Sequence, residues 1–167
     1  MNRVHLGLGG NLGDRLGALQ SALAALRARG LVPQRVSSVY DTEPVGFLEQ
    51  GNFLNLALAG HWDGTPRELL ERCLAVEAEL GRVRDFKDGP RTIDIDILLR
   101  GEQIVSEAGL EIPHPRLHLR RFVLVPLAEI GPEVIHPVLR RSFADLLAHC
   151  PDPSRVRRVA APEAVDA

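Results

Sequence analysis

The chain has 167 residues, of which 45% are hydrophobic and 25% are charged, with a formal net charge of -2 at pH 7. This composition is typical of one soluble globular domain with a substantial core, and the small net charge gives no general attraction to nucleic acid or to membranes. No apolar run approaches membrane-spanning length, and two cysteines do not make a disulfide framework. We therefore expect a cytoplasmic monomer that binds neither nucleic acid nor membrane.

The first part of the chain predicts a strand, a helix and a second strand. Residues 4–8 alternate in the manner of a strand, and Asp14 is a suitable N-cap for a helix that ends near Gly30. Residues 31–42 predict the second strand. The glycine-rich GLGGNLGD lacks the Gly-Lys-Ser/Thr of a phosphate-binding loop, so we interpret it as a tight turn from strand to helix.

The same alternation continues after a loop rich in proline and glycine. Residues 53–62 predict a third strand. Thr65 then supplies a cap, Pro66 the first helical turn and Glu68 the third position after the cap, which together predict a helix that ends at Gly81. The last strand of this series is predicted at residues 92–100.

This order, β-α-β-β-α-β, predicts a ferredoxin-like α+β fold. Two helices would cover one face of an antiparallel sheet and leave the other face free for an active site. An open, doubly wound α/β sheet is the alternative. We expect a single domain over residues 1–150 and a flexible tail over residues 151–167, which are poor in apolar side chains.

Two aspartates interrupt the apolar strand at residues 92–100. Because side chains alternate along a strand, Asp94 and Asp96 share one face. The opposite face takes Ile93, Ile95, Ile97 and Leu99. Phe53 and Asn55 of the preceding strand fall on the aspartate side. Two carboxylates about 6.6 Å apart along a strand can converge on Mg2+, although the pair alone is more typical of a solvated surface.

Arginine and histidine flank this acidic strand in the sequence. The cationic or titratable residues are Arg82, Arg84 and Arg91 before it and His114, Arg116, His118, Arg120 and Arg121 after it. A single arginine is usually a solvated charge. So many beside a carboxylate pair favour a polyphosphate site, in which metal holds the inner phosphate oxygens and guanidinium groups hold the outer ones.

Several segments together resemble the 6-hydroxymethyl-7,8-dihydropterin pyrophosphokinases of folate biosynthesis. They are LGLGGNLGDR, SSVYDTEPVG, NFLNLAL, ELGRVR, GPRTIDIDILL, IPHPRL and RRFVLVPLAEI, in order from about residue 3 to residue 137. GPRTIDIDILL is specific to that family, whereas GGNLGD alone is not. The resemblance implies transfer of pyrophosphate from ATP to the pterin hydroxymethyl group, giving AMP, with two Mg2+ ions.

The resemblance also implies a role for each candidate side chain. Asp94 and Asp96 would bind the metal and, with Arg82 and Arg91, form the catalytic group. The pterin site would comprise Thr42, Pro44, Val45, Gly46, Phe53, Asn55 and Phe122, with the two phenylalanines stacking on the ring and Asn55 reading its amide-like edge. The ATP site would comprise Glu77, Arg82, Arg84, Arg91, Ile97, His114 and Arg120.

The chain departs from the family pattern at three positions. Phe86 lies in a loop that often carries Trp, Pro115 lies where some members have Tyr, and Gly109 lies where some have Arg. Two other functions stay open at this point. One is a non-catalytic ferredoxin-like module that binds a small metabolite, and the other is a metal-dependent nucleotide hydrolase.

Overall fold

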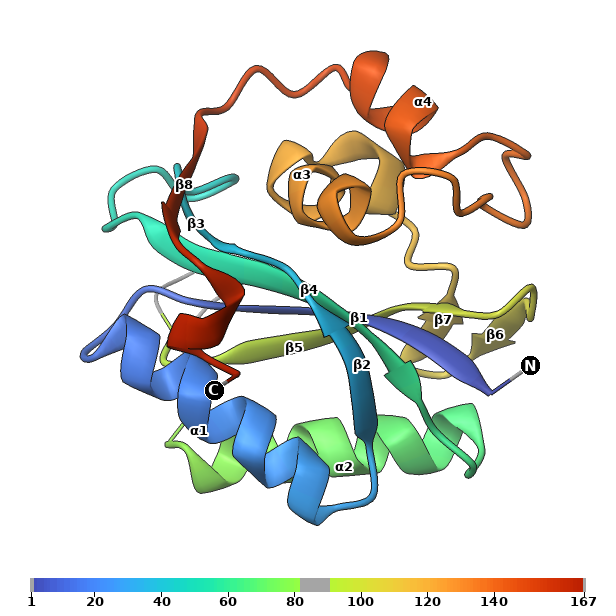
Figure 1. Ribbon diagram of the computed structural model, residues 1–167, viewed down its shortest axis with the longest axis horizontal. Coiled ribbons are helices and arrows are strands. Elements are labelled where there is room, and N and C mark those ends of the chain that lie inside the picture. The colour runs from blue at the N-terminus through green and yellow to red at the C-terminus, as the bar shows by residue number, and fades with distance from the viewer. Residues whose placement is uncertain (1, 82–90, 167) are drawn as a thin grey trace.

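The computed structural model describes residues 2–81 and 91–166. Its elements are β1 (Arg3–Gly10), α1 (Arg15–Ala28), β2 (Val32–Val36), β3 (Val39–Thr42), β4 (Phe53–His61), α2 (Pro66–Glu79), β5 (Asp94–Arg100), β6 (Val105–Glu107), β7 (Leu110–Ile112), η1 (Leu117–Leu119), α3 (Arg121–Ile130), α4 (Phe143–Ala148), β8 (Val156–Ala160) and η2 (Pro162–Ala164). The main sheet runs β5-β1-β4-β3-β8, with β2 also paired to β4 (Figure 1). All its pairings are antiparallel, which confirms the predicted α+β, ferredoxin-like fold.

The two long helices begin at the predicted residues. The Asp14 side chain accepts a hydrogen bond from the Gly17 N–H at the start of α1. At α2, Thr65 accepts from the Glu68 N–H while the Glu68 carboxylate accepts from the Thr65 N–H, a reciprocal pair that satisfies two otherwise unpaired donors. Within residues 2–81 and 91–166, no helix combines the length and the apolar character needed to cross a membrane.

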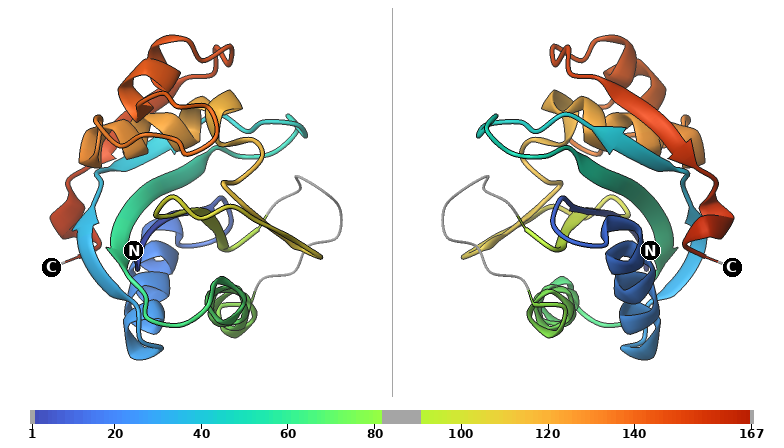
Figure 2. Two further views of the ribbon diagram at one scale, coloured as in Figure 1. Left: turned by 90° about the vertical axis from the view of Figure 1, so that its right-hand side faces the viewer. Right: turned by 90° about the vertical axis from the view of Figure 1, so that its left-hand side faces the viewer.

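The sheet separates two apolar clusters. α1 and α2 pack on one face, over Val4, Leu6 and Leu8 of β1 and the alternate leucines of β4. α3 and α4 pack on the other face, over Ala57 and Ala59 (Figure 2). The second face is therefore only partly open. The prediction of a free face is wrong where these helices lie.

The predicted strand over residues 31–42 is divided at Ser37 and Ser38. β2 pairs with the last part of β4 and β3 with its first part. Between them the Ser37 N–H donates to the Ala57 carbonyl, and the Ser37 hydroxyl accepts from the Ala57 N–H. The Ser38 N–H donates to the carboxylate of Glu129 in α3. Side-chain hydrogen bonds thus replace the strand ladder and bend the chain here.

Leu99 lies on the opposite side of the sheet from the one predicted. The pairing of β1 with β5 is irregular between His5 and Leu6, where His5 faces Leu99 but Leu6 faces Ile97. The extra residue reverses the alternation beyond it, so Leu99 joins the cluster under α3 and α4. Ile93, Ile95 and Ile97 keep the predicted side.

The tail also differs from the expectation that it packs little. Val156–Ala160 form β8, which pairs with β3 along its outer edge. Farther on, Val165 is buried in the cluster beneath α1, and the Gln20 side chain donates to the Ala164 carbonyl. Backbone pairing and one buried valine compensate for the low apolar content that predicted a flexible segment.

Candidate active site

The floor of the open face is made by glycines in the central strand β1. Gly9 pairs with Asp94 on one side and with Asn55 on the other, and Gly7 pairs with Asp96. A Cβ atom added at Gly9 would lie 1.9 Å from Asn55 Oδ1, so only glycine leaves room for that side chain. Gly7 lies in the strand as predicted. Gly9 also belongs to β1, so its interpretation as part of a tight turn is wrong.

Above this floor lies a pocket that opens to solvent. Its walls come from β3 and the segment after it, from β4, from β5 and from the start of α3. The lining residues are Gly7, Leu8, Gly9, Thr42, Glu43, Val45, Phe53, Asn55, Leu56, Ala57, Arg91, Asp94, Asp96, Leu98, Arg120, Phe122 and Val123. Segments far apart in the sequence thus converge on one cavity.

Asp94 and Asp96 both lie at this pocket, as the alternation of β5 predicts. Between them, the Ile95 N–H donates to a carboxylate oxygen of the buried Glu77 at 2.7 Å. Glu77 therefore holds the backbone of β5 from the side of α2. Within the described ranges no three His, Cys, Asp or Glu side chains form a complete metal cage. Two carboxylates at an open pocket fit Mg2+, which keeps waters and substrate phosphates as its other ligands.

Arg91 lies between the acidic strand and an aromatic ring. Its Nε is 3.5 Å from the Asp94 carboxylate, and its guanidinium lies 4.7 Å from the centre of the Phe53 ring. The Arg91 backbone is fixed by Asn11, whose N–H donates to the Arg91 carbonyl and whose Oδ1 accepts from the Arg91 N–H. This arrangement gives the pocket a positive group next to a negative one.

The aromatic rings of the pocket come from two different elements. Phe53 begins β4, and Phe122 lies in the first turn of α3. The Arg120 guanidinium lies 5.6 Å from the Phe122 ring centre, so each ring is paired with an arginine. A planar ligand between the two rings would meet both cations.

Asn55 supplies the polar group deep in the pocket. Its side chain is 8% exposed, and its amide nitrogen donates to the Thr42 hydroxyl at 2.6 Å. The carboxamide is therefore held in one orientation over Gly9. Such a group can offer a donor and an acceptor to the edge of a heterocycle.

A second cavity lies along the outer edge of β5. It is lined by Leu70, Ile95, Asp96, Ile97, Glu107, Gly109, Leu110, Glu111, His114 and Pro115. Asp96 borders both cavities. His114 is partly buried, and burial followed by the nearby Arg120 lowers its pKa to about 4, so its imidazole is neutral at pH 7.

The structure gathers most of the predicted site residues. Those at the first pocket are Thr42, Val45, Phe53, Asn55, Arg91, Asp94, Asp96, Arg120 and Phe122, and those at the second are Asp96, Ile97 and His114. Pro44 and Gly46 flank Val45 but line neither cavity. Glu77 acts on the β5 backbone. Arg82 and Arg84 lie outside the described residues.

Sequence reasoning missed several pocket residues. Gly7 and Gly9 could have been found from the alternation of β1, since they fall on the face opposite Leu6 and Leu8. Leu98 reaches the pocket on the same side as the aspartates. Val123 and Asn11 carried no signal in one sequence, because their places depend on contacts between distant elements.

A ferredoxin-like sheet with carboxylates, arginines and two phenylalanine rings at one pocket defines a class of protein suited to phosphate transfer. Comparison with known proteins identifies which member of this class it is. The family model described as 7,8-dihydro-6-hydroxymethylpterin-pyrophosphokinase matches residues 5–132. This chain therefore belongs to that family.

Individual relatives agree with the family model. The chain is 45% identical over 145 residues to the 2-amino-4-hydroxy-6-hydroxymethyldihydropteridine pyrophosphokinase of Aquifex aeolicus, covering 87% of this chain and 90% of that protein. It is 44% identical over 162 residues to the protein of the same name in Methylorubrum extorquens, covering 95% and 99%.

Solved structures share the fold. The chain resembles the wild-type HPPK-DHPS of Plasmodium falciparum with a TM-score of 0.70 at 15% identity, over 89% of this chain. The match spans only 44% of that longer chain. At this identity the likeness supports the fold and not the chemistry.

Proposed function

We propose that the two cavities that meet at Asp96 are the pterin site and the ATP site of this pyrophosphokinase. The chain transfers pyrophosphate from ATP to 6-hydroxymethyl-7,8-dihydropterin in folate biosynthesis, using ATP as co-substrate and Mg2+. The observation that carries the assignment is the position of Asp96, which borders both cavities. A metal held there would lie where the two substrates meet.

The first pocket has the chemistry of a pterin site. Phe53 and Phe122 provide two ring faces, and Asn55 provides a fixed carboxamide for the amide-like edge of the pterin. Arg91 lies against the Phe53 ring, so a pterin that stacks there displaces the guanidinium toward the phosphates. Thr42 orients Asn55, and Pro44, Val45 and Gly46 form the rim.

The second cavity has the chemistry of the nucleotide side. Ile97 contributes an apolar surface, and neutral His114 offers a hydrogen-bonding group without adding charge. Arg91 and Arg120 lie on the pterin side and offset phosphate charge from there, and Arg82 and Arg84 precede them in the sequence. Glu77 supports the site through the Ile95 backbone, and its place in the ATP site stays a prediction.

Asp94 and Asp96 are the residues that would hold Mg2+. We propose two ions, because two carboxylates lie on the same side of β5, two residues apart, and Asp96 borders both cavities. The metal supplies charge neutralisation and orients the phosphates. The protein itself positions the pterin hydroxyl for attack on the β-phosphorus. The new oxygen–phosphorus bond replaces the bond from that phosphorus to the α-phosphate oxygen, so AMP leaves and the hydroxyl proton passes to solvent without a strong protein base. Arginines stabilise the charge that develops.

The test measures AMP formation from ATP by the purified chain with the reduced pterin and Mg2+. We expect AMP in equal amount to the pterin diphosphate, none without pterin, loss of activity with EDTA and recovery with excess Mg2+. Absence of AMP at micromolar enzyme, with pterin still bound, would support a binding module. Loss of ATP without pterin would support a nucleotide hydrolase.

The cytoplasmic location and the monomeric state remain predictions. Gel filtration with light scattering measures the mass of the species that turns over. A mass of one chain across the concentration range of the assay is the expected result.

A further inference from the structure

The first turn of α3 forms part of the wall of the pterin pocket. The N-cap residue of this helix does not cap it with a side-chain hydrogen bond. Phe122 and Val123 lie in this turn, and Arg120 precedes it; all three line the pocket. Arg120 is the N-cap residue, but its side chain makes no capping hydrogen bond. The first N–H groups of a helix have no partner within the helix, so this turn needs an acceptor from elsewhere.

That acceptor is Asp152, from the segment that follows α4. Its Oδ2 accepts from the Arg121 N–H at 3.0 Å. Its other oxygen accepts from the N–H and hydroxyl of Ser154. Burial alone would raise the pKa of Asp152, but these hydrogen bonds outweigh burial and lower it, so the group is a carboxylate at neutral pH. A carboxylate at a helix N-terminus also interacts favourably with the helix dipole.

The same segment also reaches a second wall of the pocket. The Arg155 N–H donates to the Glu43 carboxylate, and the Glu43 N–H donates to the Arg155 carbonyl at 3.2 Å. Val156 then pairs with Thr42. Thr42 and Glu43 line the same pocket. Residues 152–156, which we call the strap, therefore connect both walls.

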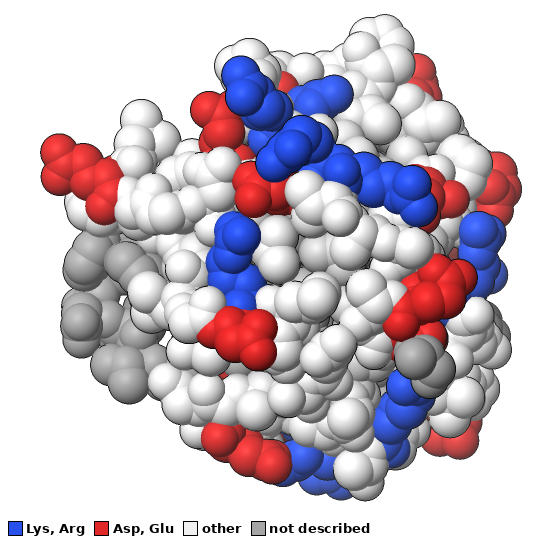
Figure 3. Space-filling model, turned by 60° about the vertical axis from the view of Figure 1, so that its left-hand side comes forward, with Lys and Arg blue, Asp and Glu red and all other residues white. Residues whose placement is uncertain are grey.

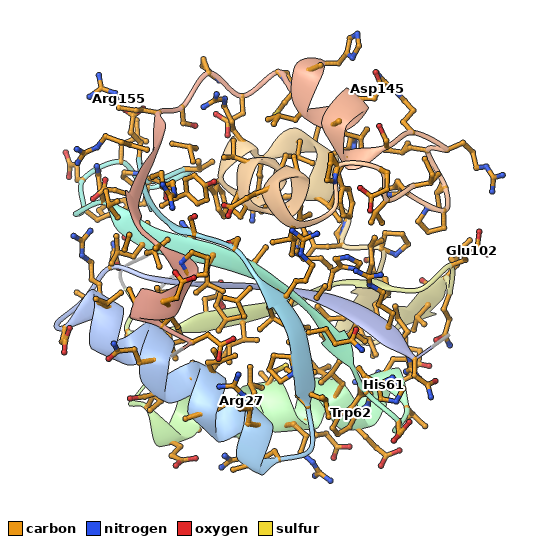
Figure 4. All side chains as sticks on the ribbon, viewed as in Figure 1. Arg27, His61, Trp62, Glu102, Asp145 and Arg155 are labelled. Atoms are coloured by element: carbon orange, nitrogen blue, oxygen red, sulfur yellow. The ribbon has the colours of Figure 1, made fainter. Side chains whose placement is uncertain are left out.

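The strap lies on the outside of the molecule, away from the helices α1 and α2. Figure 4 places Arg155 at the upper left, where the chain from α4 descends into β8, and Asp145 on α4 at the upper right. In Figure 3 the side of the molecule that carries β8 comes toward the viewer, and a band of basic side chains crosses the upper half of this view. The strap is hydrogen-bonded to Arg121 and Glu43, and none of its residues is among the described residues that line the pocket.

The far end of α3 is fixed independently. The Glu129 carboxylate accepts from the Ser38 N–H and hydroxyl and from the Tyr40 hydroxyl at 2.6 Å. Arg158 of β8 donates to the Ser38 hydroxyl at 2.7 Å. Loss of the Asp152 contact would therefore free the first turn of α3 without detaching the helix.

We propose that Asp152 is a positioning residue for the pterin site, acting through the first turn of α3 on Phe122. It touches no substrate. It sets the separation between the Phe122 wall and the wall that carries Thr42, which determines how well a flat ring fits between Phe53 and Phe122. This proposal rests on the assignment of the first pocket to the pterin.

The test compares Asp152→Ala and Asp152→Asn with the control Ser142→Ala. Ser142 caps α4 by accepting from the Asp145 N–H, so its loss weakens a nearby helix start that does not line the pocket. We expect Asp152→Ala to raise KM for pterin about tenfold, with KM for MgATP changed less than about twofold. Asp152→Asn should give an intermediate rise of about threefold, because an amide oxygen accepts a weaker hydrogen bond than a carboxylate.

Hydrogen exchange of the Arg121 to Val123 amides supplies a readout that does not depend on turnover. Exchange there should accelerate in Asp152→Ala and stay at the wild-type rate in Ser142→Ala. An unchanged pterin KM, or an equal rise in Ser142→Ala, would overturn the proposal. If Asp152→Ala does not fold, the same measurements on Asp152→Asn and Ser142→Ala test the proposal. A wild-type pterin KM in Asp152→Asn would then overturn the proposal. A wild-type chain that makes no AMP would instead contradict the assigned function, while the exchange rates would still report on the cap.

Discussion

The two faces of the sheet use the same strands for opposite purposes. In β1, Leu6 and Leu8 face α1 and α2, whereas Gly7 and Gly9 face the pocket. In β5, isoleucines face the helices and aspartates face the pocket. One face is filled and stabilises the fold, and the other is emptied of side chains in its centre so that a ligand can enter. A substitution should therefore affect stability on the filled face, and it should affect activity in the open centre of the pocket face.

Among the substitutions that test the difference between the two faces, the loss of an aspartate from the pocket face should have the largest effect on turnover. Asp94→Ala or Asp96→Ala should lower turnover by about 10³-fold or more, because a carboxylate that we propose as a metal ligand is removed. The melting temperature should stay within about 3 °C of wild type, since neither side chain packs in the core. Glu102→Ala is the control, because Glu102 is exposed in the turn after β5. An unfolded variant with full activity per folded molecule would show that the face is wrongly assigned.

The next largest effect is a loss of stability on the face of the sheet that α1 and α2 cover. Leu6 is fully buried, and Leu6→Ala should lower the free energy of unfolding by about 3 kcal/mol through lost burial and a residual cavity. Urea denaturation measures this loss. KM for pterin and for ATP should stay near wild type in the folded fraction. A large change in either KM without a loss of stability would show that the two faces are not separate.

The pH dependence of stability at His5 tests the packing of α4 on the pocket-side face of the sheet. The His5 ring packs edge to face on Phe143, with 5.5 Å between the ring centres, and burial followed by Arg3 lowers its pKa to about 4. The unfolded chain takes up a proton below pH 6.5 that the folded chain does not. The free energy of unfolding should therefore fall as the pH decreases from 6.5 toward 4, by about 2 kcal/mol for this group.

The variant His5→Leu isolates this contribution. Its free energy of unfolding should fall less steeply than that of wild type between pH 6.5 and 4. His114, whose pKa is also lowered to about 4, retains its own dependence in both proteins. Parallel curves for wild type and His5→Leu would contradict the assignment to His5.

The smallest expected effect is a selective loss within the pocket. Asn55→Ala should weaken pterin binding about tenfold, since one buried polar contact is lost, and leave ATP binding nearly unchanged. Asn52→Ala is a matched control, because exposed Asn52 bonds Asp41 outside the pocket. Titration calorimetry with each substrate separates the two losses. Equal losses for pterin and ATP would contradict the role of Asn55.

Local patterns predicted the part of the fold that depends on local chemistry. The caps at Asp14 and Thr65 and the alternation of Asp94 and Asp96 are set by residues close in the sequence, and the structure has them as predicted. The bulge that moves Leu99 depends on pairing between β1 and β5. No pattern within β5 alone contains that information.

The C-terminal segment could not be predicted for a similar reason. β8 gains its stability from the backbone of β3, and Val165 gains its burial from α1, so apolar content within the segment was a poor guide. In the sequence, Asp152 belongs to an ordinary Asp-Pro-Ser segment. Its role as a cap depends on the position of α3, which the sequence near Asp152 does not show. Contacts over long sequence separations make the difference in each case.

The most direct test of the central claim is a crystal structure of the chain with Mn2+, a non-hydrolysable ATP analogue and the pterin. We expect anomalous scattering from Mn2+ beside Asp94 and Asp96, the pterin between Phe53 and Phe122, and the nucleotide along the outer edge of β5. Metal bound away from both aspartates, or the pterin in the cavity beside Ile97 and His114, would contradict the central claim.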